Sequence, residues 1–165
     1  MARLLKPGHM YKPALSFKQI AQLHAEHEDL FFLHQKALID RDVDGAFGVL
    51  QKYEIALNEH IDLEERWLLP AYASYEKEGG EVLLFTGEHK RIKEFVHRFY
   101  ERLYAIKVTK TKILRDQELL KLLDHQALFK GLIEHHHRRE EIYLFPTLDE
   151  KLNEVQKNKL MSAFL

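Results

Sequence analysis

The chain has 165 residues, of which 45% are hydrophobic and 31% are charged, and its formal net charge is -1. This composition is typical of one globular domain, and a chain of this length can bury a core without a disulfide or a structural metal. The balanced charge leaves no basic excess that would attract nucleic acid. We therefore expect partners other than nucleic acid.

Histidine stands out in the composition, because the chain contains 11 histidines and no cysteine. The lack of cysteine excludes a disulfide framework, a thiolate zinc site, an iron–sulfur cluster and thiol catalysis. Histidine is the side chain whose ordinary pKa lies near physiological pH, and its neutral imidazole is a common metal ligand. Any chemistry of this protein should therefore involve its histidines.

The sequence carries no signal for a membrane. No segment approaches the ~20 apolar residues that a spanning helix needs, and the segment 1–15 has no apolar run long enough for a signal peptide. We expect a cytoplasmic protein that does not bind a membrane. No motif names a protein partner.

Apolar residues recur at helical spacing throughout, and no stretch alternates as a half-buried strand does. The sequence therefore predicts an all-α fold. Ser16 and Gln19 form the pattern of a capping box at the start of the first helix, and Pro70 and Pro146 should kink or end regular helix. The helices are expected at about 16–40, from 44 to the Gly79-Gly80 pair, at 81–108 and 116–144, with a loop at 109–115 and a short terminal helix at about 153–164.

Four helices of this length with short connections pack most simply as an up-down-up-down four-helix bundle. We expect residues 1–165 to form a single domain, with the bundle over about 16–150 and the short C-terminal helix after it.

An internal repeat divides this bundle into two helical hairpins. Segments 59–70 and 135–146 align without a gap, and each reads histidine, three residues, a Glu-Glu pair, four residues and proline. Upstream of each, a Glu-His pair lies at the matching place, at Glu26-His27 and at Glu88-His89. The two hairpins therefore have one design and an approximate two-fold relationship.

Six polar residues fall on the apolar stripes of the four helices and should point into the core. Residues one helical turn apart point the same way, so His60 lies above Glu64, and His136 above Glu140. Burial of two unpaired carboxylates costs several kcal/mol each. A dinuclear cation site, with two carboxylates between two histidine pairs, removes that cost, and its predicted ligands are His27, His60, Glu64, His89, His136 and Glu140.

The alternative is a buried network of hydrogen bonds without a metal. The duplicated motif favours the metal site over this alternative. Imidazole nitrogens and carboxylate oxygens suit iron, manganese or zinc.

These motifs resemble the hemerythrin-like, HHE cation-binding domain family, and the resemblance covers about residues 16–150. It implies a four-helix bundle that holds two non-haem iron ions with an oxo or hydroxo bridge. In that arrangement His27 and His60 would ligate one iron, and His89 and His136 the other. Glu64 and Glu140 would bridge the two.

Two departures distinguish the chain from the oxygen-carrying hemerythrins. Those proteins have a second histidine one turn after the ligand of the third helix, where this chain has Lys93. Their last carboxylate is an aspartate five residues after the histidine, where this chain has Glu140 at four. Both departures resemble the bacterial and sensor branch of the family. Lys93 in place of a ligand histidine implies an open coordination position on the iron held by His89 and His136, where oxygen, nitric oxide or peroxide could bind, and this favours reactivity over oxygen carriage.

The resemblance implies a protein that binds or reacts with oxygen, nitric oxide or peroxide, as a sensor, a scavenger or a modest oxidase or peroxidase. The alternative is an iron-responsive module in which metal occupancy controls a contact with a partner. Zinc binding without a redox role is a third option.

The remaining polar residues near the motifs receive other expectations. His24 lies one turn before His27 and could fill the coordination position that Lys93 leaves open. Lys93 should either turn its amine to solvent or lie beside a bridging carboxylate, and in the second case the pKa of the amine should be lowered. His135 and His137 should face solvent.

Two further pairs of residues have predicted roles. His34 and His125 should be buried histidines that form hydrogen bonds in the core. Glu65 and Glu141 should orient ligand imidazoles or form ion pairs with Arg66 and Arg138.

Overall fold

The computed structural model describes residues 16–76 and 80–164, and every regular element in these two ranges is helical. The all-α fold is therefore confirmed. The elements are η1 (Phe17–Gln19), α1 (Ala21–Ile39), α2 (Val43–Leu63), the π-helical turn η2 (Glu64–Leu68), α3 (Leu69–Ala73), α4 (Gly80–Val108), α5 (Lys112–Arg139), the π-helical turn η3 (Glu140–Leu144), α6 (Phe145–Lys151) and α7 (Glu154–Met161). Neither range contains a helix long and apolar enough to span a membrane.

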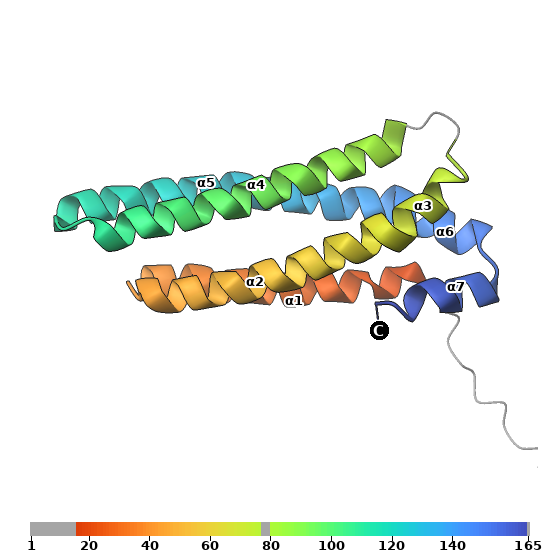
Figure 1. Cartoon of the computed structure of the whole chain (residues 1–165), viewed down its shortest axis with the longest axis horizontal. Coiled ribbons are helices and arrows are strands. Elements are labelled where there is room, and N and C mark those ends of the chain that lie inside the picture. Colours follow the sequence, from red (N-terminus) through yellow and green to blue (C-terminus); the bar gives the residue numbers. More distant parts are fainter. Residues whose placement is uncertain (1–15, 77–79, 165) are drawn as a thin grey trace, which may run out of the picture.

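The long helices pack in two pairs. Helix α1 packs against α2, and α4 packs against α5, while contacts of α2 with α4 and of α1 with α5 join the pairs. Figure 1 shows the two pairs lying lengthwise beside each other, with α3, α6 and α7 gathered at one end. Side chains from all four long helices can therefore meet in the space between the pairs.

The start of the first helix differs from the sequence prediction. The hydroxyl of Ser16 accepts a hydrogen bond from the backbone N–H of Lys18 at 3.3 Å and donates one to Asp149 at 2.6 Å. It thus caps the short 3₁₀ turn η1 and ties it to α6, so the predicted capping box with Gln19 is wrong. A true capping box begins α7, where Asn153 and Gln156 exchange two hydrogen bonds of 3.0 Å.

The other predicted boundaries are close to the observed ones, with two exceptions. Helix α5 begins at Lys112 and not near Asp116, so the predicted loop is shorter. The guanidinium of Arg115 donates two hydrogen bonds to the carbonyl of Thr109, at 3.0 and 3.2 Å, and this holds the connection closed. The sequence predicts that the second helix ends at the Gly79-Gly80 pair, but the regular helix ends earlier, at Ala73, and a turn at Ser74 and Tyr75 follows it. Gly79 itself lies outside the described residues.

The apolar core forms two clusters along the length of the molecule. In α2, Leu50 and Leu57 belong to the first cluster, whereas Leu68 in the following turn belongs to the second. In α5 and η3, Ile133 belongs to the first and Leu144 to the second. The predicted metal ligands of these helices lie between, so a buried polar layer separates the two clusters.

Candidate metal centre

Helix α1 buries a different face from the one predicted. Its buried residues follow spacings of three and four and are His24, His27, Phe31, His34 and Leu38. In the sequence, the apolar residues Leu23 and Leu30 flank His27 at helical spacing and predict a stripe through it, but both are only half-buried. Two histidines of α1 therefore point toward the layer between the two apolar clusters, and His24 is the nearer of them to the motif glutamates.

Both motif glutamates begin a π-helical turn, η2 at Glu64 and η3 at Glu140. The N–H of Leu69 donates to the carbonyl of Glu64, five residues before it, and Phe145 does the same to Glu140. A proline follows in each case, and in a regular helix its ring would collide with the preceding turn. The wider π turn contains one extra residue and relieves that collision. The His-x-x-x-Glu-Glu-x-x-x-x-Pro repeat is thus a repeat of local structure as well.

Each carboxylate spans two histidines from different helices. Glu64 places Oε1 at 3.1 Å from Nε2 of His60 and Oε2 at 3.3 Å from Nε2 of His89. Glu140 places Oε1 at 2.8 Å from Nε2 of His136 and Oε2 at 3.2 Å from Nε2 of His24. Each glutamate therefore has one oxygen on either side of a central point, which is the arrangement of a bridging carboxylate.

Two groups of metal-ligating atoms arise within the described residues, and they share the two glutamates. One consists of His24, His60, Glu64 and Glu140, and the other of Glu64, His89, His136 and Glu140. The ligand atoms within each group lie within 4.8 Å of one another, and all of these residues are buried. The structure thus brings together five of the six predicted ligands.

His27 is the predicted ligand that lies outside both groups. Its ring is buried beside the cluster, 5.2 Å from the ring of His60, but His24 supplies the imidazole from α1. The physical reason is the phase of α1, because its buried face places His24 opposite Glu140. His24 is therefore the candidate donor from α1, in the place for which the sequence predicted His27.

The carboxylate oxygens of Glu64 and Glu140 lack the hydrogen bonds that buried oxygens normally have. All four carboxylate oxygens of Glu64 and Glu140 are buried, and none has a hydrogen-bond partner among residues 16–76 and 80–164. The ring nitrogens of the four histidines lie at 2.8 to 3.3 Å from them. Burial of unpaired carboxylate oxygens is costly, and a cation at the point on which they converge satisfies them.

The spacing of the imidazoles agrees with this interpretation. The Nε2 atoms of His24 and His60 lie 3.2 Å apart, and those of His89 and His136 lie 3.2 Å apart as well. Two nitrogen ligands on one metal at about 2.0–2.1 Å are separated by roughly 2.9–3.4 Å for octahedral to tetrahedral angles. The donor set therefore fits two metal ions, each between one pair of imidazoles.

Carboxylates outside the cluster hold the second imidazole pair. Nδ1–H of His89 donates to Oε1 of Glu65 at 2.9 Å, and Nδ1–H of His136 donates to Oε2 of Glu88 at 3.0 Å. Arg139 donates to the other oxygen of Glu88 at 3.1 Å. In the neutral rings these hydrogen bonds place the proton on Nδ1, so Nε2 is the nitrogen that is directed at the cluster and free to bind a metal.

Glu88 is the carboxylate beside the cluster whose contact the sequence did not predict. Glu65 accepts a hydrogen bond from the imidazole of His89 and thus orients it, which is one of the two roles predicted for this residue. Glu141, for which the same roles were predicted, is exposed. The repeated Glu-His pair at 26–27 and 88–89 was the signal that could have identified Glu88, since its carboxylate lies beside the histidine of the facing helix.

The charge distribution of the metal-free cluster follows from its burial. Burial and the neighbouring Glu64 raise the pKa of Glu140 to about 7. Burial alone would raise the pKa of Glu64 as well, but the imidazoles of His60 and His89 outweigh it and hold that pKa well below its usual range. Burial also opposes a charge on His136, yet Glu140 and Glu88 raise its pKa to about 10. Without a metal, a proton on His136 thus compensates the buried carboxylates.

The histidines on the α1 side have the opposite tendency. Burial and the neighbouring His137 and His60 lower the pKa of His24 to about 2. Burial, His136 and His60 lower the pKa of His137 to about 3. These imidazoles are therefore neutral at pH 7, which is the form that binds metals.

Three other predictions can be compared with the structure. His137 was expected to face solvent, but it is half-buried, and its ring stacks on that of His24 with centroids 3.7 Å apart. This correction has a simple cause, because a side chain about 100° from His136 still faces the neighbouring helix α1. His135 is exposed as predicted, 2.8 Å from Nη2 of Arg139. Lys93 turns its amine to the surface, where it pairs with Asp62 at 3.2 Å.

The two histidines predicted for the core differ from each other. His34 is fully buried, and its ring nitrogens lie 2.8 Å from the carbonyl of Ala46 and 2.8 Å from the amide nitrogen of Gln126. His125 is half-buried, and the neighbouring Gln126 takes the core position in its place. The prediction is confirmed for His34 and wrong for His125, since the buried face of α5 is rotated by one residue.

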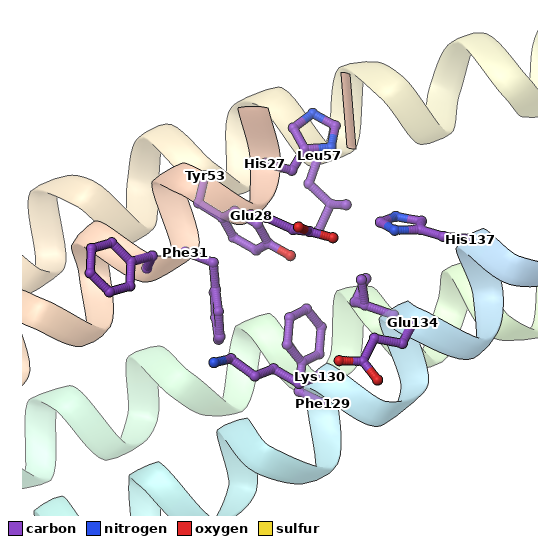
Figure 2. A pocket seen from close by; sticks show the side chains of 11 residues that line it. His27, Glu28, Phe31, Tyr53, Leu57, Phe129, Lys130, Glu134 and His137 are labelled. Carbon is purple, nitrogen blue, oxygen red and sulfur yellow. The ribbon is translucent and has the colours of Figure 1, made fainter. Parts of the chain in front are cut away.

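A pocket of about 210 Å³ lies beside the cluster, between α1, α2 and α5. Figure 2 shows Tyr53, Phe31 and Phe129 on its wall together with His27 and His137. His137 stacks on His24, and His27 lies next to His60, so the histidine end of the pocket borders the cluster. The pocket is large enough for a small molecule to approach the His24–His60 pair.

Comparison of the chain with protein-family models, with curated proteins and with solved structures finds no match.

Proposed function

We propose that the chain is a hemerythrin-like protein with two non-haem iron ions that binds or reacts with oxygen, nitric oxide or peroxide. One observation carries the proposal. Glu64 lies between His60 and His89, and Glu140 lies between His24 and His136, with one carboxylate oxygen directed to each histidine. Two bridging carboxylates between two imidazole pairs are the ligand set of a dinuclear centre.

The proposed scaffold is an up-down-up-down four-helix bundle. Its support is the closed ring of helix contacts, in which α1 meets α2, α2 meets α4, α4 meets α5, and α5 meets α1. Such bundles build metal sites from side chains that face inward on neighbouring helices. The short terminal helix α7 lies outside this ring, at the end where α3 and α6 lie (Figure 1).

Iron is the proposed metal, and manganese and zinc also suit the ligands. Imidazole nitrogen and carboxylate oxygen bind all three, whereas the resemblance of the motifs to the hemerythrin-like family favours iron. When bound, iron would supply electrons and open coordination positions to a small ligand.

The protein residues would hold the metals and control what reaches them. The two apolar clusters enclose the ligand layer on both sides and exclude bulk water. Glu65 and Glu88 fix the rings of His89 and His136. The neutral imidazole of His137 lines the pocket and stacks on His24, so it lies between the pocket and the cluster. A small ligand would enter through that pocket and meet the His24–His60 side first.

Lys93 supports a reactive role over oxygen carriage. Its amine is paired with Asp62 at the surface, so this position contributes no ligand to the cluster. Each imidazole pair then consists of two histidines, from α1 and α2 or from α4 and α5. The proposed irons would each keep positions at which oxygen, nitric oxide or peroxide could bind.

Binding of nitric oxide or azide to iron-loaded protein tests this function. The metal-free chain is loaded with Fe²⁺ under anaerobic conditions, and nitric oxide is then added to the ferrous form and azide to the oxidised form. We expect new visible absorption bands at ligand concentrations comparable to the protein. Zinc-loaded protein is the control and should show none. Iron-loaded protein whose spectrum does not respond to either ligand would contradict the proposal.

A specific contact favours the second candidate, an iron-responsive module. Phe164, which follows α7, places its ring edge-on to that of His60, with centroids 6.0 Å apart. Metal binding that fixes His60 would also fix the C-terminal segment. Hydrogen exchange of residues 154–164 with and without iron tests this candidate: strong protection only in the iron-loaded form would support it, and equal protection would contradict it.

A further inference from the structure

The two imidazole pairs of the cluster have different surroundings. On one side, both outer nitrogens, Nδ1 of His89 and Nδ1 of His136, donate to carboxylates at 2.9 and 3.0 Å. On the other side, Nδ1 of His60 is buried and has no hydrogen-bond partner among the residues that the structure describes. The cluster is therefore asymmetric, although the motifs that form it are repeated.

We infer that the two metal positions differ in affinity, and that the His89–His136 position fills first and the His24–His60 position second. This inference rests on the proposed dinuclear centre and concerns how its two halves differ. A carboxylate bonded to the outer nitrogen of a ligand imidazole fixes its ring and tautomer and makes the inner nitrogen a stronger donor. Both ligands of the first position have this support.

The support of the first position is itself well anchored. Glu88 is held by Arg139, which donates hydrogen bonds of 3.1 and 3.3 Å to Oε1. Glu65 comes from the turn η2, next to the bridging Glu64. The first position is therefore preorganised before a metal binds.

The second position relies on ring contacts. His24 stacks on His137, with centroids 3.7 Å apart and an interplanar angle of 3°. His60 has the aromatic edges of His27 and Phe164 around it. Stacked rings restrict rotation, but they do not increase the basicity of the ligating nitrogen as a carboxylate does.

The internal repeat explains why the second position lacks carboxylates. In the repeat, Glu141 corresponds to Glu65, and Glu26 corresponds to Glu88. Both Glu26 and Glu141 are exposed. Helix α1 reaches the cluster through His24, one turn before the Glu26-His27 pair, so the carboxylate of that pair is displaced from His60. The phase of α1 thus breaks the symmetry of the two halves.

The position of lower affinity is also the one beside the pocket. His27 and His137 line the pocket, and these rings contact His60 and His24. A metal at the second position would therefore exchange through the pocket more readily than the metal between His89 and His136. A chain with one metal would carry it at the enclosed first position.

Titration of the metal-free chain with Co²⁺ against a competing chelator tests the inference, because the Co²⁺ absorption spectrum also reports the ligands. We expect two binding steps whose dissociation constants differ at least about tenfold. Glu65→Ala and Glu88→Ala should weaken the first step by about 10- to 100-fold. The matched controls Glu141→Ala and Glu26→Ala, at the corresponding places of the repeat, should leave both steps unchanged.

A further variant assigns the steps to positions. His24→Ala should remove the weaker step and leave the tighter one, and circular dichroism of each variant verifies the helical fold. Two steps of equal affinity, or equal effects of the variants and their matched controls, would overturn the inference and leave the dinuclear centre intact. Failure to bind Co²⁺ at all would refute the proposed function itself. If Glu88→Ala does not fold, Glu65→Ala with its control Glu141→Ala decides alone.

Discussion

Nε2 of His24 lies 3.2 Å from Oε2 of Glu140, so the first helix meets the cluster one turn earlier than the repeated Glu-His pair indicates. His27, on the same buried face, lies beside the cluster and lines the pocket. His24 and His27 lie one turn apart on the same face of α1, so both are candidate ligands in the sequence, and the structure places only His24 against Glu140.

The first prediction compares these two residues. His24→Ala removes a ligand and should reduce the metal content from two ions per chain to about one. His27→Ala removes a wall of the pocket and should retain both ions. Elemental analysis of the purified variants, with circular dichroism as a check on folding, measures the difference. Loss of metal in His27→Ala with retention in His24→Ala would restore the ligand assignment that the sequence suggested.

The second prediction concerns the fourth helix. His136→Ala or Glu140→Ala should cost at least one metal, because each side chain is buried and directed at the centre. His135→Ala is the matched control, since it changes the neighbouring exposed imidazole on the same helix. Metal analysis of the three variants distinguishes the two faces of α5. An equal loss in His135→Ala would mean that the orientation of this helix is wrong.

The third prediction is a stability maximum of the metal-free chain near neutral pH. On the acid side, His24, His27 and His137 have pKa values lowered to about 2, 4 and 3, mainly by burial. Their folded pKa lies below the unfolded value of about 6.5, so stability present above pH 6.5 is lost as the pH falls. Each group contributes up to about 1.4 kcal/mol per pH unit. The pKa of Glu140 is raised to about 7, so the contribution of this group to stability increases as the pH falls. It is one group against three histidines, and the loss of stability on the acid side therefore prevails.

On the alkaline side the sign is reversed. Burial opposes the charge on His136, but Glu140 and Glu88 raise its pKa to about 10, above the unfolded value of 6.5. Its contribution is present below pH 6.5 and is lost as the pH rises toward 10. Thermal unfolding of the chelator-treated protein from pH 5 to 9 should therefore show a midpoint that falls in both directions from about pH 7. A midpoint that rises steadily across this range would contradict the ionisation states described for the cluster.

The fourth prediction addresses the pocket as an entry route. Ile133 is buried on its wall, and Ile133→Trp should fill part of the volume at a cost of about 1–3 kcal/mol in stability. Azide binding to the iron-loaded variant should slow at least about tenfold while the metal content stays at two, as measured by stopped-flow absorption. Ile142→Trp, at a half-exposed position of η3 outside the pocket lining, is the control. An unchanged rate in Ile133→Trp would show that ligands enter elsewhere.

Much of the fold and of the cluster could be predicted because the helices that contribute most of the candidate ligands have a regular apolar stripe or the repeated His-x-x-x-Glu motif. In α4 the apolar stripe of Phe85, Ile92 and Val96 carries His89 into the core, and the structure buries all four residues. The His-x-x-x-Glu repeat places His60 above Glu64 for the same geometric reason.

The sequence was less informative where polar residues occupy the buried face. In α1 three of the five buried residues are histidines, so the hydrophobic pattern favoured Leu23 and Leu30 and shifted the stripe by one residue. In α5 the buried Gln126 had the same effect and led to His125. The π turns were also not predicted, because a proline signals a break but not how the backbone absorbs it.

Iron content together with the optical spectrum of the reconstituted protein tests the central claim most directly. Chain loaded with Fe²⁺, oxidised in air and freed of excess metal should carry close to two irons per chain and show ferric charge-transfer absorption in the near ultraviolet. Fewer than one iron per chain after reconstitution would contradict the dinuclear centre.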